Sequence, residues 1–248
     1  MSRFNFYILL LHHLGTHYVI TGASRGIGKT ISHYFAKEGY TLVLLALNTK
    51  NLEQAQTELK AQYPLCLVET VSVDFNNPSD VESAIKSIIE MHENIDVLVN
   101  SAGVLAAGNT DISLATLSEL VNVNLLSTIT ACNLIAEKMK QQGYGEIYNL
   151  GSTAGLVPVP KIAAYSATKA AMVSYSQSLY QELLPFGVKV CCLCPSVVDT
   201  DMTNDGRIDN KLKIETQDLA KALSFVRSLS PGAAVNTLSI RCSVIDLE

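Results

Sequence analysis

Short apolar runs rich in Val, Ile and Leu alternate along the chain with longer segments whose apolar residues recur at helical spacing. Such runs are typical of strands that are buried on both faces. They predict seven strands, at residues 17–21, 41–46, 66–73, 95–100, 146–150, 188–193 and 238–242. Strands that alternate with helices favour parallel pairing through right-handed helical crossovers. The pattern therefore predicts an α/β fold, a doubly wound parallel sheet with helices on both faces.

The segment 78–91, PSDVESAIKSIIEM, illustrates the helical pattern. Apolar residues at spacings of three and four share one face of this segment, and these are Val81, Ile85, Ile88 and Ile89. Ser79 and Glu82 have the spacing of a capping box, so we expect them to begin the helix.

No Pro-, Gly- or Ser-rich linker, internal repeat or low-complexity stretch interrupts the series of strands and helices. We therefore expect a single catalytic domain over residues 16–248, preceded by an N-terminal extension of residues 1–15. In a doubly wound sheet, ligands bind outside the carboxyl ends of the strands, near the point where the strand order reverses. Functional residues are therefore expected in the loops that follow the strands.

The extension, MSRFNFYILLLHHLG, weakly resembles a signal peptide, with one Arg before a short apolar stretch. It has no small-residue cleavage site, and its apolar run is far shorter than the roughly 20 residues that span a bilayer. We interpret it as an extension or an apolar flap packed on the domain, and peripheral membrane contact stays open as an alternative. No membrane span is expected.

Composition narrows the classes of partner. The chain of 248 residues is 48% hydrophobic and 17% charged, which is typical of a globular protein with a substantial core. A net charge of -5 and the lack of any Lys/Arg cluster in the sequence argue against nucleic acid as a partner. The five histidines form no ligand pattern in the sequence, so no metal site is expected.

Three of the six cysteines lie in the run VKVCCLCP, where Cys191 and Cys194 form a C-x-x-C pair. A redox or metal role would need exposed thiolates, and a metal site would need a second pair of ligands. The run is instead typical of a buried apolar strand, in which free cysteine behaves as a small hydrophobic residue. Reduced cysteines suit a cytoplasmic protein, which is the location we expect.

The loop after the first predicted strand, TGASRGIG, is rich in glycine and leads into a helical pattern. Glycines at this place permit a tight turn, and the N-terminal amides of the helix, at the positive end of its dipole, would bind a pyrophosphate. Glycine triplets also mark ordinary turns, but the position after the first strand favours a dinucleotide site. The candidate cofactor contacts in this turn are Gly22, Ser24, Arg25, Gly26, Ile27 and Gly28.

The end of the second predicted strand would contact the ribose of the cofactor. A carboxylate roughly 20 residues after the glycines would bind the 2′-hydroxyl and repel a 2′-phosphate. The stretch 42–51 contains no acidic residue. Arg25 is placed to meet a 2′-phosphate, Lys50 adds positive charge, and Asn48 is a further candidate contact. The missing acid favours NADP(H), although Arg25 as a merely solvated side chain stays open.

Tyr165 and Lys169 are four residues apart in AYSATKAAMVSYSQSL, so both side chains lie on one face of a predicted helix. A free tyrosine, with a pKa of about 10, is a poor base at neutral pH. A lysine ammonium about 4 Å away, at an effective dielectric of about 20, would lower that pKa by roughly three units. We therefore expect Tyr165 to ionise at about pH 7, where acid/base catalysis is most efficient. The alternative is a half-buried tyrosine beside a surface lysine.

Five motifs occur in the order and with the spacing of the short-chain dehydrogenase/reductase family, namely TGASRGIG, NSAG, VNVN, the segment of Ser152, and YSATK. In combination they are highly specific, and the chain resembles this family over residues 16–245. The resemblance implies a seven-stranded Rossmann sheet and an enzyme that moves a hydride between a nicotinamide and a carbonyl or alcohol.

The resemblance also implies roles for particular residues. Tyr165 would be the proton donor or acceptor, Ser152 would polarise the substrate oxygen, and Lys169 would also bind the nicotinamide ribose. Asn124 would hold the water that completes a proton relay. By the same resemblance, the cofactor would contact Asp74, Phe75, Asn100, Ala102, Gly103, Tyr165, Lys169, Pro195, Val198 and Thr200.

Three departures from the family pattern bear on substrate and assembly. Ser196 stands where the family usually has glycine, which would shift the backbone beside the nicotinamide. The stretch from Met202 to a helix beginning near Gln217 is short, so we expect a small lid over the substrate. The C-terminal segment lacks the glycine-rich ending of many tetrameric members, so homodimer and homotetramer both stay open.

The leading hypothesis is a NADP(H)-dependent reductase of small-molecule carbonyls, similar to 3-oxoacyl-thioester reductases or to general carbonyl reductases. Ala107, Leu156 and Val157 suggest an apolar substrate pocket, although packing would explain them equally well. The alternative is a non-catalytic NADP(H)-binding sensor or partner protein, because a fold does not determine function. Such a protein would not need all four of the catalytic residues together.

Overall fold

Parallel strands and helices alternate along the chain in the computed structural model, which describes residues 16–245. The first half contains β1 (His17–Thr21), α2 (Gly26–Lys37), β2 (Thr41–Ala46), α3 (Thr49–Gln62), β3 (Val68–Ser72), α4 (Pro78–Met91), β4 (Val97–Asn100), α5 (Leu114–Val121), the π-helical turn η1 (Asn122–Leu126) and α6 (Ser127–Gln142). The second half contains β5 (Gly145–Leu150), η2 (Thr153–Gly155), α7 (Ala163–Leu183), η3 (Leu184–Phe186), β6 (Val188–Pro195), η4 (Asp201–Thr203), η5 (Asn210–Leu212), α8 (Thr216–Ser228) and β7 (Thr237–Ile240). The extension expected at residues 1–15 lies outside the described residues.

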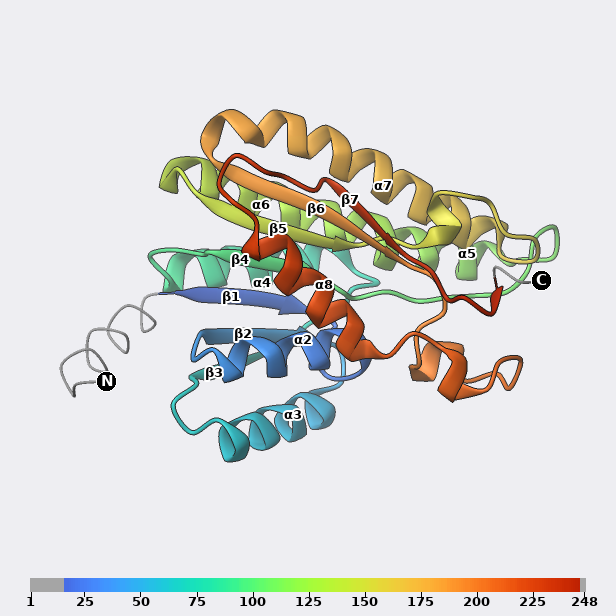
Figure 1. Ribbon diagram of the computed structural model, residues 1–248, viewed down its shortest axis with the longest axis horizontal. Helices are drawn as coiled ribbons and strands as arrows, with labels where there is room; N and C mark the ends of the chain where they lie inside the picture. The colour runs from blue at the N-terminus through green and yellow to red at the C-terminus, as the bar shows by residue number, and fades with distance from the viewer. Residues whose placement is uncertain (1–15, 246–248) are drawn as a thin grey trace.

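The seven strands form one parallel sheet in the order β3-β2-β1-β4-β5-β6-β7 (Figure 1). This order confirms the doubly wound Rossmann sheet that the alternation of elements predicts. The order reverses between β1 and β4, so the loops that leave these two strands flank the crevice where such sheets bind ligands.

Strand ends are where the predicted bounds differ from the observed ones. β1 and β2 have the predicted bounds, whereas β3 and β4 begin two residues later and β6 continues to Pro195. Apolar periodicity shows which residues are buried. Where a strand begins is determined instead by its hydrogen bonding to the neighbouring strand. At the edge of the sheet, the register of β3 with β2 starts at Val68, opposite Leu42, which leaves Cys66 outside the strand.

Two apolar layers cover the sheet. Tyr18, Ile20 and their neighbours on one face pack against α2, α3 and α8, and the opposite face packs against α4, α6 and α7 (Figure 1). Successive residues of β6 alternate between these layers, with Cys191 in the first and Val190 in the second. All six cysteines are free and buried, which confirms the structural interpretation of the VKVCCLCP run.

The start of α4 corrects the predicted capping box. The N-cap residue is Asn77, whose Oδ1 accepts a hydrogen bond from Ser79 N at 3.2 Å. Pro78 occupies the first helical position, which favours a cap at the residue before it. Glu82 pairs instead with Lys86, one turn along the helix, at 2.6 Å.

The continuous helical run Leu114–Gln142, formed by α5, η1 and α6, is the one described helix long and apolar enough to cross a membrane. Half of its most apolar segment of 18 residues is buried inside the protein. Residues such as Ile135 and Met139 belong to the core layer between the sheet and the helices. Buried core helices can be equally long and apolar, so this run is only weak support for a membrane span.

Candidate active site

The turn between β1 and α2 needs glycine because two backbone segments meet there. Gly22 has φ +65°, and a Cβ at this position would lie 2.7 Å from the backbone nitrogen of Ala102. Gly28, in the first turn of α2, packs so closely against the carbonyl of Gly22 that a Cβ there would clash with it. The loops after β1 and β4 are therefore in contact at the crevice.

The N-terminus of α2 is electrostatically uncompensated. Arg25 is its N-cap residue but makes no side-chain capping hydrogen bond, and the first turn contains no acidic residue. By contrast, α3 and α5 begin with capping side chains, from Asn48 and Ser113. Uncapped amides and a positive dipole end beside a close glycine turn fit the pyrophosphate of a dinucleotide.

Arg25 projects into solvent and pairs with a residue that is distant in sequence. Its Nη1 lies 3.3 Å from Asp201 Oδ2, and both side chains are largely exposed. An exposed pair of this kind is weak, so the guanidinium is free to turn toward a phosphate. Asn48, the other candidate at this end, uses its Oδ1 to accept from Asn51 N at 3.0 Å, so its side chain caps α3.

The remaining predicted cofactor residues follow the carboxyl ends of their strands. Asp74 and Phe75 come shortly after β3. Asn100 ends β4, where its Nδ2 donates to Asn149 Oδ1 at 2.9 Å, and Ala102 and Gly103 come next. Pro195 ends β6, and Val198 and Thr200 follow it. Thr200 lies against the glycine turn, because a Cβ at Gly26 would be 3.4 Å from its Cγ2. The structure thus brings all of these positions to one edge of the sheet.

The buried polar atom Asn100 Oδ1 has no hydrogen-bond partner among the described residues. An unpaired buried acceptor is costly, and in native proteins it calls for an explanation such as a ligand or a water. Its position at the end of β4, beside the glycine turn, agrees with a bound polar group at this edge.

Ser152, Tyr165 and Lys169 meet beyond the end of β5. Ser152 precedes the short helix η2, and its Oγ accepts from Ala154 N at 3.1 Å. A side-chain hydrogen bond joins Ser152 to Tyr165. Lys169, one turn further along α7, places its Nζ 5.8 Å from the centre of the Tyr165 ring and donates to Leu150 O at 2.7 Å. The three side chains therefore form one cluster.

Burial dominates the electrostatics of this cluster and corrects one expectation. It raises the pKa of Tyr165, and only the hydrogen bond from Ser152 opposes that rise. It also lowers the pKa of Lys169 to about 8. The lysine does not lower the tyrosine pKa as expected, because its ammonium is directed to the Leu150 carbonyl rather than to the phenol oxygen. The spacing of Tyr165 and Lys169 in the sequence predicts neither their burial nor the contact of Lys169 with the Leu150 carbonyl.

Asn124 lies in the π-helical turn η1, where its buried side chain links two loops of the site. Its Oδ1 accepts from Val104 N at 2.8 Å, and its Nδ2 donates to Val104 O at 2.9 Å. The side chain therefore holds the loop after β4 in place. Single π turns inside α-helices are frequent at functional sites, but the sequence pattern continues through this turn as ordinary helix.

Sequence reasoning missed the backbone link in front of Tyr165. Among the described residues, Lys161 is the one non-glycine with a positive φ, +68°. Its carbonyl accepts from Gly108 N at 2.7 Å, and Ala163 N donates to Asn109 Oδ1 at 2.9 Å. This contact joins the loop after β4 to the start of α7. Lysine carries no sequence signal for a left-handed backbone.

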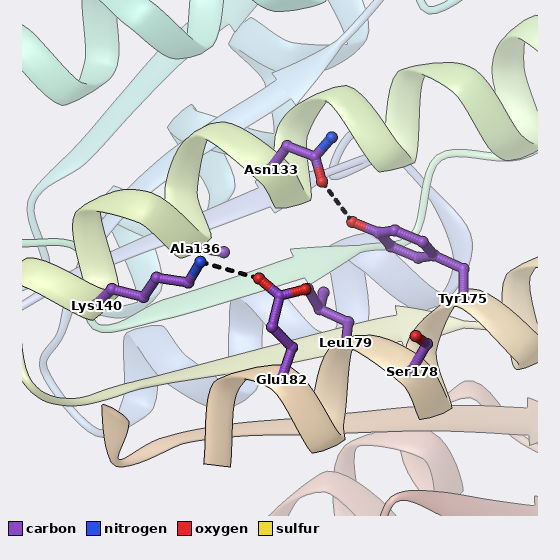
Figure 2. A pocket seen from close by; sticks show the side chains of 7 residues that line it. All are labelled: Asn133, Ala136, Lys140, Tyr175, Ser178, Leu179 and Glu182. Atoms are coloured by element: carbon purple, nitrogen blue, oxygen red, sulfur yellow. Dashed lines mark hydrogen bonds and ion pairs between the residues drawn. The ribbon is translucent and has the colours of Figure 1, made fainter. Parts of the chain in front are cut away.

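A shallow hollow of about 250 Å³ between α6 and α7 is a different feature (Figure 2). Tyr175 Oη donates to Asn133 Oδ1 at 2.9 Å, and Lys140 Nζ donates to Glu182 Oε1 at 2.9 Å, so both pairs bridge the two helices across the hollow. None of the predicted catalytic or cofactor residues lines it. The candidate site is therefore the carboxyl edge of the sheet, where the predicted residues meet, and not this hollow.

Comparison with known proteins decides the family. A profile of short chain dehydrogenases matches residues 16–211. The chain belongs to the short chain dehydrogenase family. An uncharacterized oxidoreductase of Staphylococcus epidermidis is 33% identical over 224 residues, which cover 90% of this chain and 95% of the relative. Membership of this family makes the protein an oxidoreductase.

Solved structures of other proteins share this fold. An alcohol dehydrogenase from the archaeon Thermococcus sibiricus, complexed with 5-hydroxy-NADP, has a TM-score of 0.83 and 27% identity, over 92% of this chain and 96% of that one. A short-chain dehydrogenase from Sphingobium yanoikuyae in complex with NADPH has a TM-score of 0.79 and 28% identity, over 91% and 87% of the two chains.

Two departures of this dehydrogenase from the family pattern are accommodated locally. Ser196 is outside the positive-φ region, and its N–H donates to Ile240 O at 2.8 Å, which continues the β6–β7 pairing. The segment after Thr200 forms two short helical turns, η4 and η5. Buried Lys213 holds these turns together, because its Nζ donates to Thr203 O at 2.7 Å and to Asn210 Oδ1 at 2.8 Å.

Proposed function

We propose that this dehydrogenase reduces an apolar small-molecule carbonyl with NADPH and oxidises the corresponding alcohol with NADP⁺. The hydrogen-bonded pair of Ser152 and Tyr165, with buried Lys169 behind it, carries the proposal. Two hydrogen-bonded hydroxyl groups support the binding of one substrate oxygen beside them. The uncapped start of α2 lies on the same edge of the sheet.

The residues divide the work of proton transfer. NADPH, when bound, supplies a hydride to the carbonyl carbon. Ser152 donates a hydrogen bond to the carbonyl oxygen, and Tyr165 gives its phenolic proton to that oxygen as charge develops there. The phenolate that remains keeps the hydrogen bond from Ser152, which favours its ionised form. Asn124 would support the proton relay by holding the loop after β4 against the site, because its side chain is hydrogen-bonded to Val104.

The cofactor is NADP(H) rather than NAD(H). No acidic residue lies in the stretch 42–51, which covers most of β2 and the start of α3. A carboxylate at the end of β2 would repel a 2′-phosphate. Arg25, exposed at the mouth of the glycine turn, supplies the charge-assisted hydrogen bonds that a phosphate needs. The Thermococcus sibiricus and Sphingobium yanoikuyae neighbours were solved with a NADP derivative and with NADPH.

Exposed apolar side chains favour an apolar substrate. The loop between Ser152 and Tyr165 contains Leu156, Val157 and Val159, which are 41%, 61% and 42% exposed. Covering such side chains contributes about 25 cal/mol for each Å² of apolar surface removed from water. A ketone or 3-oxoacyl thioester with an alkyl chain would cover them, whereas a sugar would not.

A substrate screen tests this function. Simple ketones and 3-oxoacyl thioesters of increasing chain length are offered with NADPH and with NADH, and Tyr165→Phe serves as the inactive reference. We expect NADPH-dependent turnover whose kcat/KM rises with chain length. Binding of NADPH without turnover of any carbonyl would instead support a non-catalytic sensor, and higher efficiency with NADH would contradict the role of Arg25.

A matched pair of variants tests the apolar loop. Val157→Asp should lower kcat/KM for long-chain substrates several-fold and leave the shortest ketone unaffected, because only a long chain reaches the loop. Leu65→Asp, at an equally exposed position in the α3–β3 connection, is the control and should change neither. Equal losses for short and long substrates in Val157→Asp would contradict the apolar contact.

We further propose a cytoplasmic homodimer or homotetramer. The free cysteines suit a reducing compartment. The outer faces of α6 and α7, around Ser178 and the hollow of Figure 2, are the surface we assign to the second subunit. Ser178→Arg should reduce the mass measured by sedimentation equilibrium, and an unchanged mass would exclude this surface.

A further inference from the structure

Residues 104–109, which we call the strap, connect the loop after β4 to α7. At the beginning of the strap, Asn124 Nδ2 donates to Val104 O at 2.9 Å and to Thr168 Oγ1 at 3.3 Å. Thr168 Oγ1 itself donates to Tyr165 O at 2.8 Å. Asn124 and Thr168 are both buried, so this end of the strap is fixed to the part of α7 that follows Tyr165.

The end of the strap is bonded to the start of α7, on the other side of Tyr165. Gly108 N donates to Lys161 O at 2.7 Å, and Ala163 N donates to Asn109 Oδ1 at 2.9 Å. Lys161 makes its contact from a left-handed backbone, with φ +68°, which lysine rarely adopts. The strap is therefore attached to the helix both before and after Tyr165.

The N-terminus of α7 has no capping side chain of its own. Its N-cap residue is Ile162, which makes no side-chain capping hydrogen bond. Ser166 N donates to Ile162 O at 2.9 Å, and the N–H groups of residues 163–165 come too early in the helix to have such a partner. Asn109 supplies an acceptor to the first of these groups. It therefore caps α7 from outside the helix, across 54 positions of sequence.

Bonds within the turn at the end of the strap direct the Asn109 side chain to the helix. Asn109 N donates to Asp111 Oδ1 at 3.0 Å, which fixes the backbone of the turn. Gly108 has φ +126°, and a Cβ there would lie 3.3 Å from the same carboxylate oxygen. A side chain is disfavoured at Gly108 for both reasons. The turn thus presents the amide group of Asn109 to Ala163 N.

We propose that Asn109 is a positioning residue for Tyr165. By completing the first turn of α7, it fixes the backbone from which Tyr165 extends, so that the phenol keeps its hydrogen bond with Ser152. Proton transfer requires hydrogen-bond geometry, so a small displacement of the phenol lowers the rate. Asn109 acts through the helix rather than on substrate. The capping contact is independent of the reaction, whereas its effect on turnover rests on the proposed function.

Amide hydrogen exchange tests the capping contact in the protein without cofactor. Asn109→Ala should raise the exchange rate of the first turn of α7 about five- to ten-fold, because it removes the acceptor of Ala163 N. Asn109→Asp keeps an oxygen acceptor, which the helix dipole favours, and should keep the protection. Thr110→Ala, at the next exposed position, is the control and should leave the exchange unchanged. Equal exchange in wild type and Asn109→Ala overturns the proposal.

Steady-state kinetics test the effect on Tyr165. The kcat of Asn109→Ala, counted per NADPH-binding site so that unfolded protein is left out, should fall about ten-fold while KM stays within about two-fold. Asn109→Asp should restore kcat, and Thr110→Ala should keep it. An unchanged kcat in Asn109→Ala, or a loss that Asn109→Asp does not restore, overturns the link to Tyr165. Failure of wild type to reduce any carbonyl would count against the proposed function alone, because the exchange measurement still decides the capping contact.

Discussion

Two cations, Lys169 and Arg227, lie at opposite ends of strand β5 and differ in how their charge is compensated. At the amino end, Arg227 Nε donates to Glu146 Oε2 and Nη2 donates to Tyr18 Oη, both at 2.8 Å. Its guanidinium also lies over three aromatic rings, including that of Phe35 at 5.3 Å. At the carboxyl end, Lys169 has a carbonyl and two thiols.

The difference shows in the pKa values. Burial opposes the charge of Arg227, but Glu146 and the neighbouring tyrosines outweigh it, so the pKa of Arg227 is raised. Burial of Lys169 meets little opposition, and its pKa falls to about 8. A compensated buried cation stabilises the fold, whereas a poorly compensated one lies near its ionisation point and is suited to chemistry. We therefore expect Arg227 to contribute to stability and Lys169 to contribute to the proposed reaction.

The largest expected effect is on kcat, from a substitution near the carboxyl end of β5. Tyr165→Phe removes the phenolic proton and should reduce kcat by about 10²- to 10⁴-fold, while the free energy of unfolding changes by about 1 kcal/mol or less. NADPH affinity, measured by fluorescence titration, should be retained. Turnover at the wild-type rate would remove the basis for treating this end as reactive.

At the amino end of β5, Arg227→Met should lower stability and leave turnover unchanged. It leaves Glu146 with the Tyr148 hydroxyl but without its cation and removes the ring contacts, so the free energy of unfolding should fall by about 3 kcal/mol. Urea denaturation measures this loss, and kcat below the unfolding transition should be unchanged. A comparable loss of kcat would show that the two ends are coupled.

Lys169→Met should abolish turnover and yet stabilise the fold by about 1–3 kcal/mol at neutral pH, because it removes the cost of a buried ammonium. The folded pKa of about 8 lies below the unfolded value of about 10.4. The unfolded chain therefore binds more protons between these values, and wild-type stability attributable to Lys169 rises with pH across that window. Denaturation at pH values across that window should show this rise in wild type and not in the variant. A variant less stable than wild type at neutral pH would show that Lys169 is compensated like Arg227.

The smallest expected effect concerns the exposed pair of Arg25 and Asp201, which is neither buried nor strongly held. Asp201→Asn frees the guanidinium and should tighten NADPH binding about two- to five-fold. Arg25→Ala should weaken NADPH binding about ten-fold and leave NADH binding unchanged. Equal changes for both cofactors would place Arg25 away from the 2′-phosphate.

Local features of this protein were predictable from sequence because they depend on neighbours along the chain. The strands of the sheet, the glycine turn before α2 and the helical spacing of Tyr165 and Lys169 are of this kind. Periodicity encodes which face is buried, and glycine encodes where the backbone turns or approaches another segment. These patterns were sufficient to place the predicted site residues at one edge of the sheet.

Tertiary structure decided how those residues are connected. Arg25 meets Asp201 across 176 positions of sequence, and Asn124 meets Val104 through a π turn that no periodicity marks. The ionisation of Lys169 depends on a carbonyl from β5 and on thiols from β6, both brought to α7 only by sheet pairing. Burial and hydrogen-bond direction are properties of the assembled fold, so sequence spacing located the candidate lysine while the structure determined its surroundings.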